Sequence, residues 1–108
     1  MKVIATHFFY RSAKPLAKRY KSFNEDYQRL LREIEANPQM GIDLGGGLRK
    51  IRMSITSKGR GKSGGCRVIT FDAIERNGNL YLVYVFDKAD SSSVHTKIML
   101  EYVKALGI

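Results

Sequence analysis

Hydrophobic residues recur at helical spacing in the first third of the chain and alternate with polar residues farther on. Lys2–Phe8 alternates loosely and is rich in β-forming residues, which predicts an opening strand. Ser12 is expected to cap a short helix, with Pro15 in its first turn, where proline is tolerated. Ser22 and Glu25 have the spacing of a capping box, which predicts the start of a second helix.

The second predicted helix carries a regular hydrophobic stripe. Its members are Phe23, Tyr27, Leu30, Leu31 and Ile34. Asn37-Pro38 is expected to end this helix, because proline disfavours a helical conformation in the residue before it. Very few residues separate the two helices, so they are predicted to form an αα-hairpin. A loop is expected over Gln39–Gly47, which ends in three glycines.

Two segments in the middle of the chain have the patterns of β-strands. In Leu48–Thr56 hydrophobic and polar residues alternate, so Lys50 and Arg52 are expected to share one face of the strand. Cys66–Ile74 has hydrophobic residues on both faces, which is typical of a central strand.

The C-terminal third is predicted to contain a hairpin, a polar turn and a helix. Asn77-Gly78 is a strong signal for a tight turn, which leads into a strand at Leu80–Phe86. Asp87–Ser93 is polar, and either Asp90 or one of the serines is expected to cap the last helix. The stripe of that helix consists of Val94, Ile98, Tyr102, Val103 and Leu106. The order β-α-α-β-β-β-α predicts an α+β fold: a small twisted, mainly antiparallel sheet with an N-terminal helical hairpin and a C-terminal helix.

Length and composition predict one domain over residues 1–108. The chain is 44% hydrophobic and has a single cysteine, so a core can form without disulfide bonds and a cysteine-based zinc site is excluded. No segment resembles a signal peptide or reaches the roughly 20 apolar residues of a membrane span. We therefore expect a cytoplasmic protein without membrane contact. No residues have metal-ligand spacing, and no motif predicts a small-molecule cofactor.

Basic residues are concentrated in the stretch Leu48–Arg67. The formal net charge of the chain is +9, and this stretch contains no acidic residue. Its cations are Arg49, Lys50, Arg52, Lys58, Arg60, Lys62 and Arg67. Glycines between Lys58 and Gly65 leave backbone N–H groups accessible, so the stretch is predicted to bind the phosphates of a nucleic acid. The alternative is a solvated basic loop without a ligand.

Gly61-Lys62-Ser63 resembles the end of a nucleotide-binding P-loop, but the rest of that motif is missing. The motif requires glycine at the position of Thr56 and a helix that begins at the Lys-Ser pair. Here glycines and a predicted strand follow the pair. Nucleotide hydrolysis is therefore not expected.

The basic stretch also contains side chains that can stabilise a phosphate during RNA cleavage. Lys50 and Arg52 share a strand face and Arg67 begins the next strand, so we expect all three near a scissile phosphate. His95 is the candidate for proton transfer, because an imidazole exchanges protons near neutral pH. The alternative for His95 is a surface histidine beside a helix cap. Lys88 can supply a further positive charge.

In combination, several segments resemble the RelE/ParE superfamily of bacterial toxins, and most of all its HigB/RelE-like branch. The resemblance spans nearly the whole chain, including the order of its elements. The segments that carry it are Asn37-Pro38, Leu48–Arg52, Gly59–Gly65, Arg67–Ile69, Tyr81–Tyr84 and Asp87-Lys88.

The resemblance implies a toxin of a type II toxin–antitoxin pair whose C-terminal helix can move. Such a toxin cleaves messenger RNA in the ribosomal A site without a metal ion, and an antitoxin protein neutralises it. Lys50 and Arg52 match the paired basic residues of the family's second strand, and Arg67 matches the arginine that opens its third strand. His95 occupies a position where the family often has a tyrosine, and Ala89 one where a further basic residue is common.

Two other functions stay open. A ParE-type toxin has the same fold but inhibits DNA gyrase by binding to it, and a non-catalytic RNA-binding module would use the same cations. The clustering of Lys50, Arg52, Arg67 and His95 favours a ribonuclease. The residues expected to bind the RNA or ribosome backbone are Arg49, Lys58, Arg60 and Lys62. The antitoxin is expected to cover the basic surface or to displace the last helix.

Overall fold

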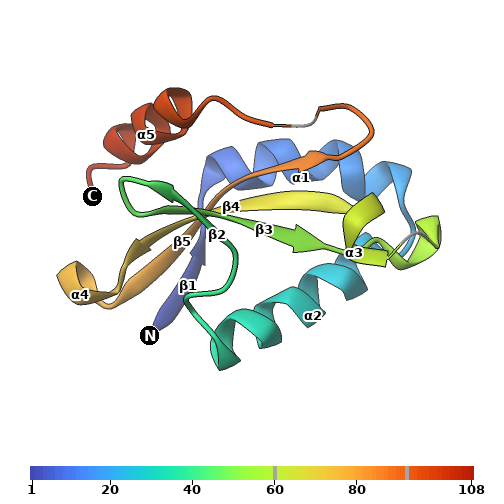
Figure 1. The fold of residues 1–108 in the computed structure, drawn as a ribbon, viewed down its shortest axis with the longest axis horizontal. Coiled ribbons are helices and arrows are strands. Elements are labelled where there is room, and N and C mark those ends of the chain that lie inside the picture. The colour runs from blue at the N-terminus through green and yellow to red at the C-terminus, as the bar shows by residue number, and fades with distance from the viewer. Residues whose placement is uncertain (60, 92) are drawn as a thin grey trace.

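The computed structural model describes residues 1–59, 61–91 and 93–108 and consists of a sheet with helices on both faces (Figure 1). The strands are β1 (Lys2–Ala5), β2 (Ile42–Gly45), β3 (Leu48–Met53), β4 (Cys66–Ala73) and β5 (Asn79–Asp87). The helical elements are α1 (His7–Arg19), α2 (Phe23–Ala36), the 3-10 turn η1 (Thr56–Lys58), α3 (Gly61–Gly64), α4 (Ile74–Asn77) and α5 (Thr96–Ala105). Two predicted roles lie outside the described residues: RNA binding by Arg60 and capping of the last helix by Ser92.

The five strands form one sheet in the order β1-β5-β4-β3-β2. The neighbours from β2 to β5 pair antiparallel, whereas β1 lies parallel to β5 at one edge. The α+β class and the mainly antiparallel sheet predicted from the sequence are therefore confirmed.

Each face of the sheet is covered by its own hydrophobic core. Alternation along β3 directs Ile51 and Met53 into the core under α1 and α2, whereas Leu48 belongs to the core under α5. Figure 1 shows α2 and α5 on opposite sides of the sheet. Because Lys50 and Arg52 alternate with Ile51 and Met53, both cations lie on the α5 face.

The first strand is shorter than predicted, and the first helix begins earlier. The strand expected over Lys2–Phe8 ends at Ala5, and α1 begins at His7. Thr6 is the N-cap of α1, because its Oγ1 accepts a hydrogen bond from the Phe9 backbone N–H at 3.2 Å. The β-forming side chains around Thr6 favoured a strand, but Phe9 reaches the core from a helix.

Ser12 and Pro15 lie inside α1, so the predicted cap at Ser12 is wrong. The Ser12 hydroxyl donates to the Phe9 carbonyl at 2.9 Å and accepts from the Val85 backbone N–H at 3.0 Å. These two bonds attach the middle of α1 to β5.

The second helix begins where predicted, but the capping box of Ser22 and Glu25 is wrong. Ser22 makes no side-chain cap bond; its hydroxyl donates at 2.7 Å to the buried carboxylate of Asp26. The helix ends before Asn37-Pro38, as predicted.

The segment predicted as a loop, Gln39–Gly47, contains the edge strand β2, which pairs antiparallel with β3. The strand predicted over Leu48–Thr56 ends earlier, at Met53. The reason is that the backbone N–H and the hydroxyl of Thr56 donate to Asp26 on α2, at 2.9 and 2.6 Å. The chain therefore leaves the sheet before Thr56.

The hairpin between β4 and β5 has a longer turn than predicted. β4 ends at Ala73, and the turn begins where the Asp72 carboxylate accepts the Ile74 backbone N–H at 3.0 Å. The helical turn α4 follows, and Gly78 reverses the chain in a left-handed conformation with a φ of +82°. The predicted two-residue turn is therefore wrong, whereas the reversal at Gly78 is confirmed.

The last helix, α5, begins at Thr96, with His95 as an N-cap that makes no side-chain cap bond. The predicted cap at Asp90 is wrong, because Asp90 pairs with Arg19 at 3.1 Å. The hydroxyl of Ser91 donates to a backbone carbonyl before the helix and does not cap it either.

The junction between β3 and β4 contains a close backbone approach at Gly65. A Cβ atom added to Gly65 would lie 2.1 Å from the Met53 carbonyl oxygen and 2.9 Å from the Ser54 Cα. Both neighbours are backbone atoms, so a larger residue would have to displace β3 itself.

Gly65→Ala is therefore expected to lower the free energy of unfolding by about 1–3 kcal/mol, the usual cost of overfilling a packed interior. Urea denaturation of both proteins measures the change. The control is Ser63→Ala, at an exposed side chain close by, with an expected effect below about 0.5 kcal/mol. Equal effects of the two substitutions would contradict the close approach.

Candidate functional site

Five cations line one cavity of about 350 Å³ on the α5 face of β3 and β4. They are Lys50, Arg52, Lys62, Arg67 and Lys88. The remaining lining residues are Met40, Gly41, Ile42 and Ile51, so no carboxylate lines this cavity within the described chain. We call it the basic cavity.

The strand register explains why the cations converge. Arg52 on β3 lies directly opposite Arg67 on β4, and Lys50 lies two residues away on the same face. The turn α3 brings Lys62 back over the end of β4. Lys88 follows the end of β5, and its backbone N–H donates to the Gly65 carbonyl at 3.2 Å. The structure thus brings together four residues that the sequence predicted as catalytic, and one predicted to bind RNA.

Arg67 is a buried cation, with only 4% of its surface exposed. Its guanidinium donates to three backbone carbonyls: Lys62 at 3.2 Å, Cys66 at 3.2 Å and Ser63 at 3.1 Å. Within the part of the chain that the structure describes, no carboxylate pairs with it. Burial and, to a lesser extent, the charge of Arg52 lower the pKa of Arg67. An anion bound in the basic cavity would relieve both effects.

Behind the basic cavity lies the buried carboxylate of Asp87. Its side chain is inaccessible to solvent and accepts from Lys58 Nζ at 2.6 Å and from Arg19 Nη1 at 2.9 Å. The Tyr20 hydroxyl and the Ala89 backbone N–H also donate to it. Burial alone would raise the pKa of Asp87, but the hydrogen bonds from Lys58 and Tyr20 outweigh it and lower the pKa to about 2.

Lys58 is therefore a structural residue and not a free cation of the loop. Besides its bond to Asp87, its Nζ donates to the Gly64 carbonyl at 2.9 Å. A carboxylate remote in the sequence therefore anchors the start of the segment from Lys58 to Gly65. We do not retain Lys58 as an RNA-binding residue.

Lys62 also lines the basic cavity, and its one carboxylate partner in the described chain is partly exposed to solvent. It pairs with Glu33 at 2.9 Å, but the two side chains are 52% and 33% exposed. Ion pairs this exposed contribute little, about 0–1 kcal/mol, so a phosphate can replace Glu33 as the partner.

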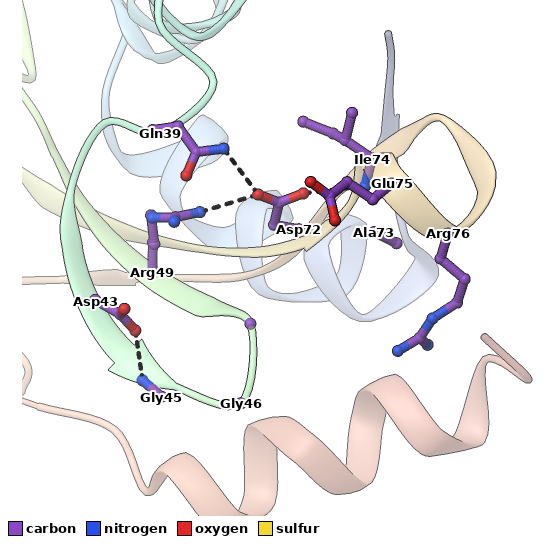
Figure 2. Close-up of a pocket in the computed structure, with 11 residues that line it drawn as sticks. Gln39, Asp43, Gly45, Gly46, Arg49, Asp72, Ala73, Ile74, Glu75 and Arg76 are labelled. Atoms are coloured by element: carbon purple, nitrogen blue, oxygen red, sulfur yellow. Dashed lines mark hydrogen bonds and ion pairs between the residues drawn. The ribbon is translucent and has the colours of Figure 1, made fainter.

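Arg49 lies outside the basic cavity that Lys62 lines. Figure 2 shows it in a second hollow, of about 780 Å³, where it and Gln39 donate to Asp72 at 3.2 and 3.0 Å. Alternation along β3 puts Arg49 on the opposite face from Lys50. Acidic residues, among them Asp43, also line this hollow. Arg49 is therefore not part of the basic cavity.

His95 also lies outside the basic cavity. It is exposed and lines a separate hollow of about 250 Å³ with aromatic neighbours such as Tyr84 and Phe86. None of the five cations lines that hollow. The expected convergence of His95 with Lys50, Arg52 and Arg67 is thus not present in this conformation.

Cys66 precedes Arg67 but is not suited to act as a nucleophile. Burial, reinforced by the charge of Asp87, raises the pKa of the thiol to about 12. In residues 1–59, 61–91 and 93–108, no three or more His, Cys, Asp or Glu side chains are grouped to hold a metal ion. No helix in those ranges is long and apolar enough to cross a membrane.

Two buried carboxylates that support the site, Asp26 and Asp87, were not predicted from the sequence. A signal existed for Asp26, which falls on the hydrophobic stripe of α2 between Phe23 and Leu30 and is therefore directed at the core. For Asp87 the signal was weaker, since the residue merely follows a hydrophobic strand. Its partners Arg19 and Lys58 are remote in the sequence.

Comparison with known protein families gives a match over nearly the whole chain. The family model described as "RelE toxin of RelE / RelB toxin-antitoxin system" matches residues 1–107.

The buried Asp87 network makes a first prediction about stability. Asp87→Asn is expected to lower the free energy of unfolding by about 3–5 kcal/mol at neutral pH, because Lys58 would stay buried without a counter-charge. Urea denaturation of the variant and the wild type measures this loss of stability. The control is Asp90→Asn, which removes an exposed partner of the same Arg19 and should cost less than about 1 kcal/mol. Similar losses in the two variants would contradict the assignment.

A second prediction concerns the stability of the fold at low pH. The folded pKa of Asp87, about 2, lies below the value of about 3.9 for an unfolded aspartate. The stabilisation by Asp87 is therefore complete above about pH 4 and is lost as the pH falls from about 4 to about 2. The free energy of unfolding should fall less steeply across this window in Asp87→Asn than in the wild type. Parallel profiles would show that Asp87 is not the titrating group.

Proposed function

Because the chain belongs to the RelE family of toxins from toxin–antitoxin systems, we propose that it stops translation by cutting messenger RNA on the ribosome. Family membership makes the protein a toxin whose partner is an antitoxin. The metal-independent endoribonuclease activity, the ribosome and the cytoplasm belong to the proposal. Assignment to the HigB/RelE-like branch stays a prediction from the sequence.

One observation carries the proposal: the buried Arg67 lies opposite Arg52 and has no carboxylate partner among the described residues. Two arginines at paired positions of neighbouring strands, one of them buried, favour occupation by an anion. A phosphodiester satisfies this arrangement, since its oxygens accept the donors that a guanidinium presents. The cations are fixed by strands and backbone bonds, so little reorganisation is needed when charge develops on the phosphate.

The proposed reaction is attack of a ribose 2′-oxygen on the adjacent phosphorus. A bond forms between the 2′-oxygen and phosphorus, and the bond to the 5′-oxygen breaks. Arg52 and Arg67 stabilise the negative charge of the crowded phosphate, and Lys50 and Lys88 line the same cavity. Lys62 holds the neighbouring backbone after exchanging Glu33 for phosphate. Arg60 is proposed to bind the RNA backbone only because it lies in the basic stretch Leu48–Arg67 of the sequence.

Two protons must move during this reaction, one from the 2′-hydroxyl and one to the 5′-oxygen. We propose His95 for one transfer, which requires the segment before α5 to carry it from its present hollow to the basic cavity. The antitoxin is proposed to cover the basic cavity or to displace α5. Either contact would block the approach of RNA.

The central prediction concerns Arg52→Gln, Lys50→Gln and Arg67→Gln. Each is expected to slow single-turnover cleavage of ribosome-bound messenger RNA by about 100-fold or more, because one preorganised donor to a developing charge is worth about 10²–10³ in rate. Primer extension on the message measures cleavage. Arg49→Gln is the matched control: it is adjacent in sequence, faces the other side of the sheet, and should cleave at close to the wild-type rate.

Three outcomes would contradict the proposal. Equal losses in Arg49→Gln and Arg52→Gln would remove the basic cavity as the site. Growth arrest with intact messages and relaxed or broken chromosomal DNA would indicate gyrase as the target. Tight binding of the wild type to RNA without any cleavage would leave a non-catalytic RNA-binding module.

His95 has its own prediction. His95→Ala should lose most of the cleavage rate, because one of the two proton transfers would lack the group proposed for it. Binding of RNA should stay unchanged, because the five cations are intact. A rate within about threefold of the wild type would remove His95 from the mechanism while leaving the basic cavity in place.

A further inference from the structure

The first 24 residues contain six lysines and arginines and no acidic residue. Most of these cations belong to α1, whose first turn has no acidic residue and whose last turn is basic. This second basic region lies outside the stretch Leu48–Arg67. The proposed cleavage reaction does not use it.

Helical spacing places these cations on one outward face. Arg11, Lys14 and Lys18 are separated by three and four residues, so they lie above one another, and Lys21 follows just beyond the helix end. The opposite side of α1 is buried through Phe9, Ala13 and Leu16. From Arg11 to Lys18 the face extends about 10 Å at 1.5 Å per residue. We call these four cations the α1 basic face.

The charges of the α1 basic face are not neutralised. All four side chains are exposed, and none pairs with a carboxylate in the described ranges. Arg19, one residue after Lys18, behaves differently, since it bonds to Asp87 and Asp90. Solvated cations one helical turn apart suit a partner that carries a row of fixed negative charges.

The position of α1 connects this face to the basic cavity. The bond from Arg19 to Asp87 places the C-terminal end of α1 beside the turn that continues into Lys88, a lining residue of the cavity. In Figure 1 the C-terminal end of α1 and the turn α3 lie at the same end of the molecule. RNA bound at the α1 basic face would therefore lie on the same end of the molecule as a strand in the basic cavity.

We propose that the α1 basic face binds the phosphate backbone of folded RNA, separate from the strand that is cut in the basic cavity. This inference rests on the proposed function, which supplies the ribosome as the source of that RNA. Tyr10 is the only large hydrophobic side chain of α1 that is exposed among the described residues, and at one end of the face Arg11 borders a hollow lined by Phe8 and Tyr102. A protein interface would need an apolar centre, whereas backbone phosphates need cations alone.

The test compares two double variants that remove the same charge from exposed helix positions. Lys14→Gln/Lys18→Gln alters the α1 basic face, and Lys97→Gln/Lys104→Gln alters α5 as the matched control. The probes are an RNA hairpin with a 16-base-pair stem (about the span of a duplex-binding domain) and purified ribosomes without message. Binding is measured over a range of salt concentrations, and thermal melting verifies that both variants fold like the wild type.

The α1 variant is expected to bind hairpin and ribosomes about 10-fold more weakly, and its salt slope should fall by about two, because each lost phosphate contact removes about 0.9. The control should change binding by less than about threefold. Equal losses in the two variants would overturn the inference, since net charge alone would then explain them. An equal loss of affinity of the α1 variant for polyglutamate and for the hairpin would overturn the assignment to RNA.

Cleavage is measured separately, at protein concentrations that saturate the ribosome. The α1 variant should then cut ribosome-bound message at the wild-type rate, because the basic cavity is unchanged. A wild type that binds the hairpin through α1 but cuts no message would sink the endoribonuclease and leave the α1 assignment standing. If the α1 variant cuts message and also binds the hairpin as tightly as the wild type, the α1 assignment would fall and the endoribonuclease would stand.

Discussion

The carboxylate of Asp87 is the interaction on which the basic cavity depends. It is fully buried, and it ties the end of β5 to the end of α1 through Arg19 and to the segment between β3 and β4 through Lys58. The Asp26 carboxylate does the same from α2, where it holds Thr56. Two acidic groups from different elements thus hold the segment between β3 and β4 in place, together with the buried side chain of Ile55.

This arrangement separates the charges that support the site from the charges that act in it. Asp87 neutralises Lys58 behind the basic cavity, whereas the cavity itself has no carboxylate among its described lining residues. Arg67 is held by carbonyl oxygens, which fix its position but leave its net charge uncompensated. In the proposed function a bound phosphate supplies the missing counter-charge and offsets the cost of an unpaired buried cation.

Much of the fold could be predicted because hydrophobic periodicity is a local signal. The stripe of α2, its stop at Asn37-Pro38 and the central character of β4 all follow from residues close together in sequence. The residues at which helices begin were harder to predict. Thr6 and Ser12 are both competent caps, and the choice of Thr6 depends on Phe9 finding the core.

The amino-acid sequence was enough to predict that Lys50 and Arg52 share a strand face, because alternation along a strand requires no partner. It also determined the absence of acidic residues from Leu48–Arg67. The pairing of each cation with a carboxylate, in contrast, follows from the tertiary structure. Lys58 forms an ion pair with Asp87, and Arg49 forms one with Asp72, whereas Arg67 has no carboxylate partner in the described chain. The physical reason is that partners of a buried charge are selected by packing between segments far apart in the chain.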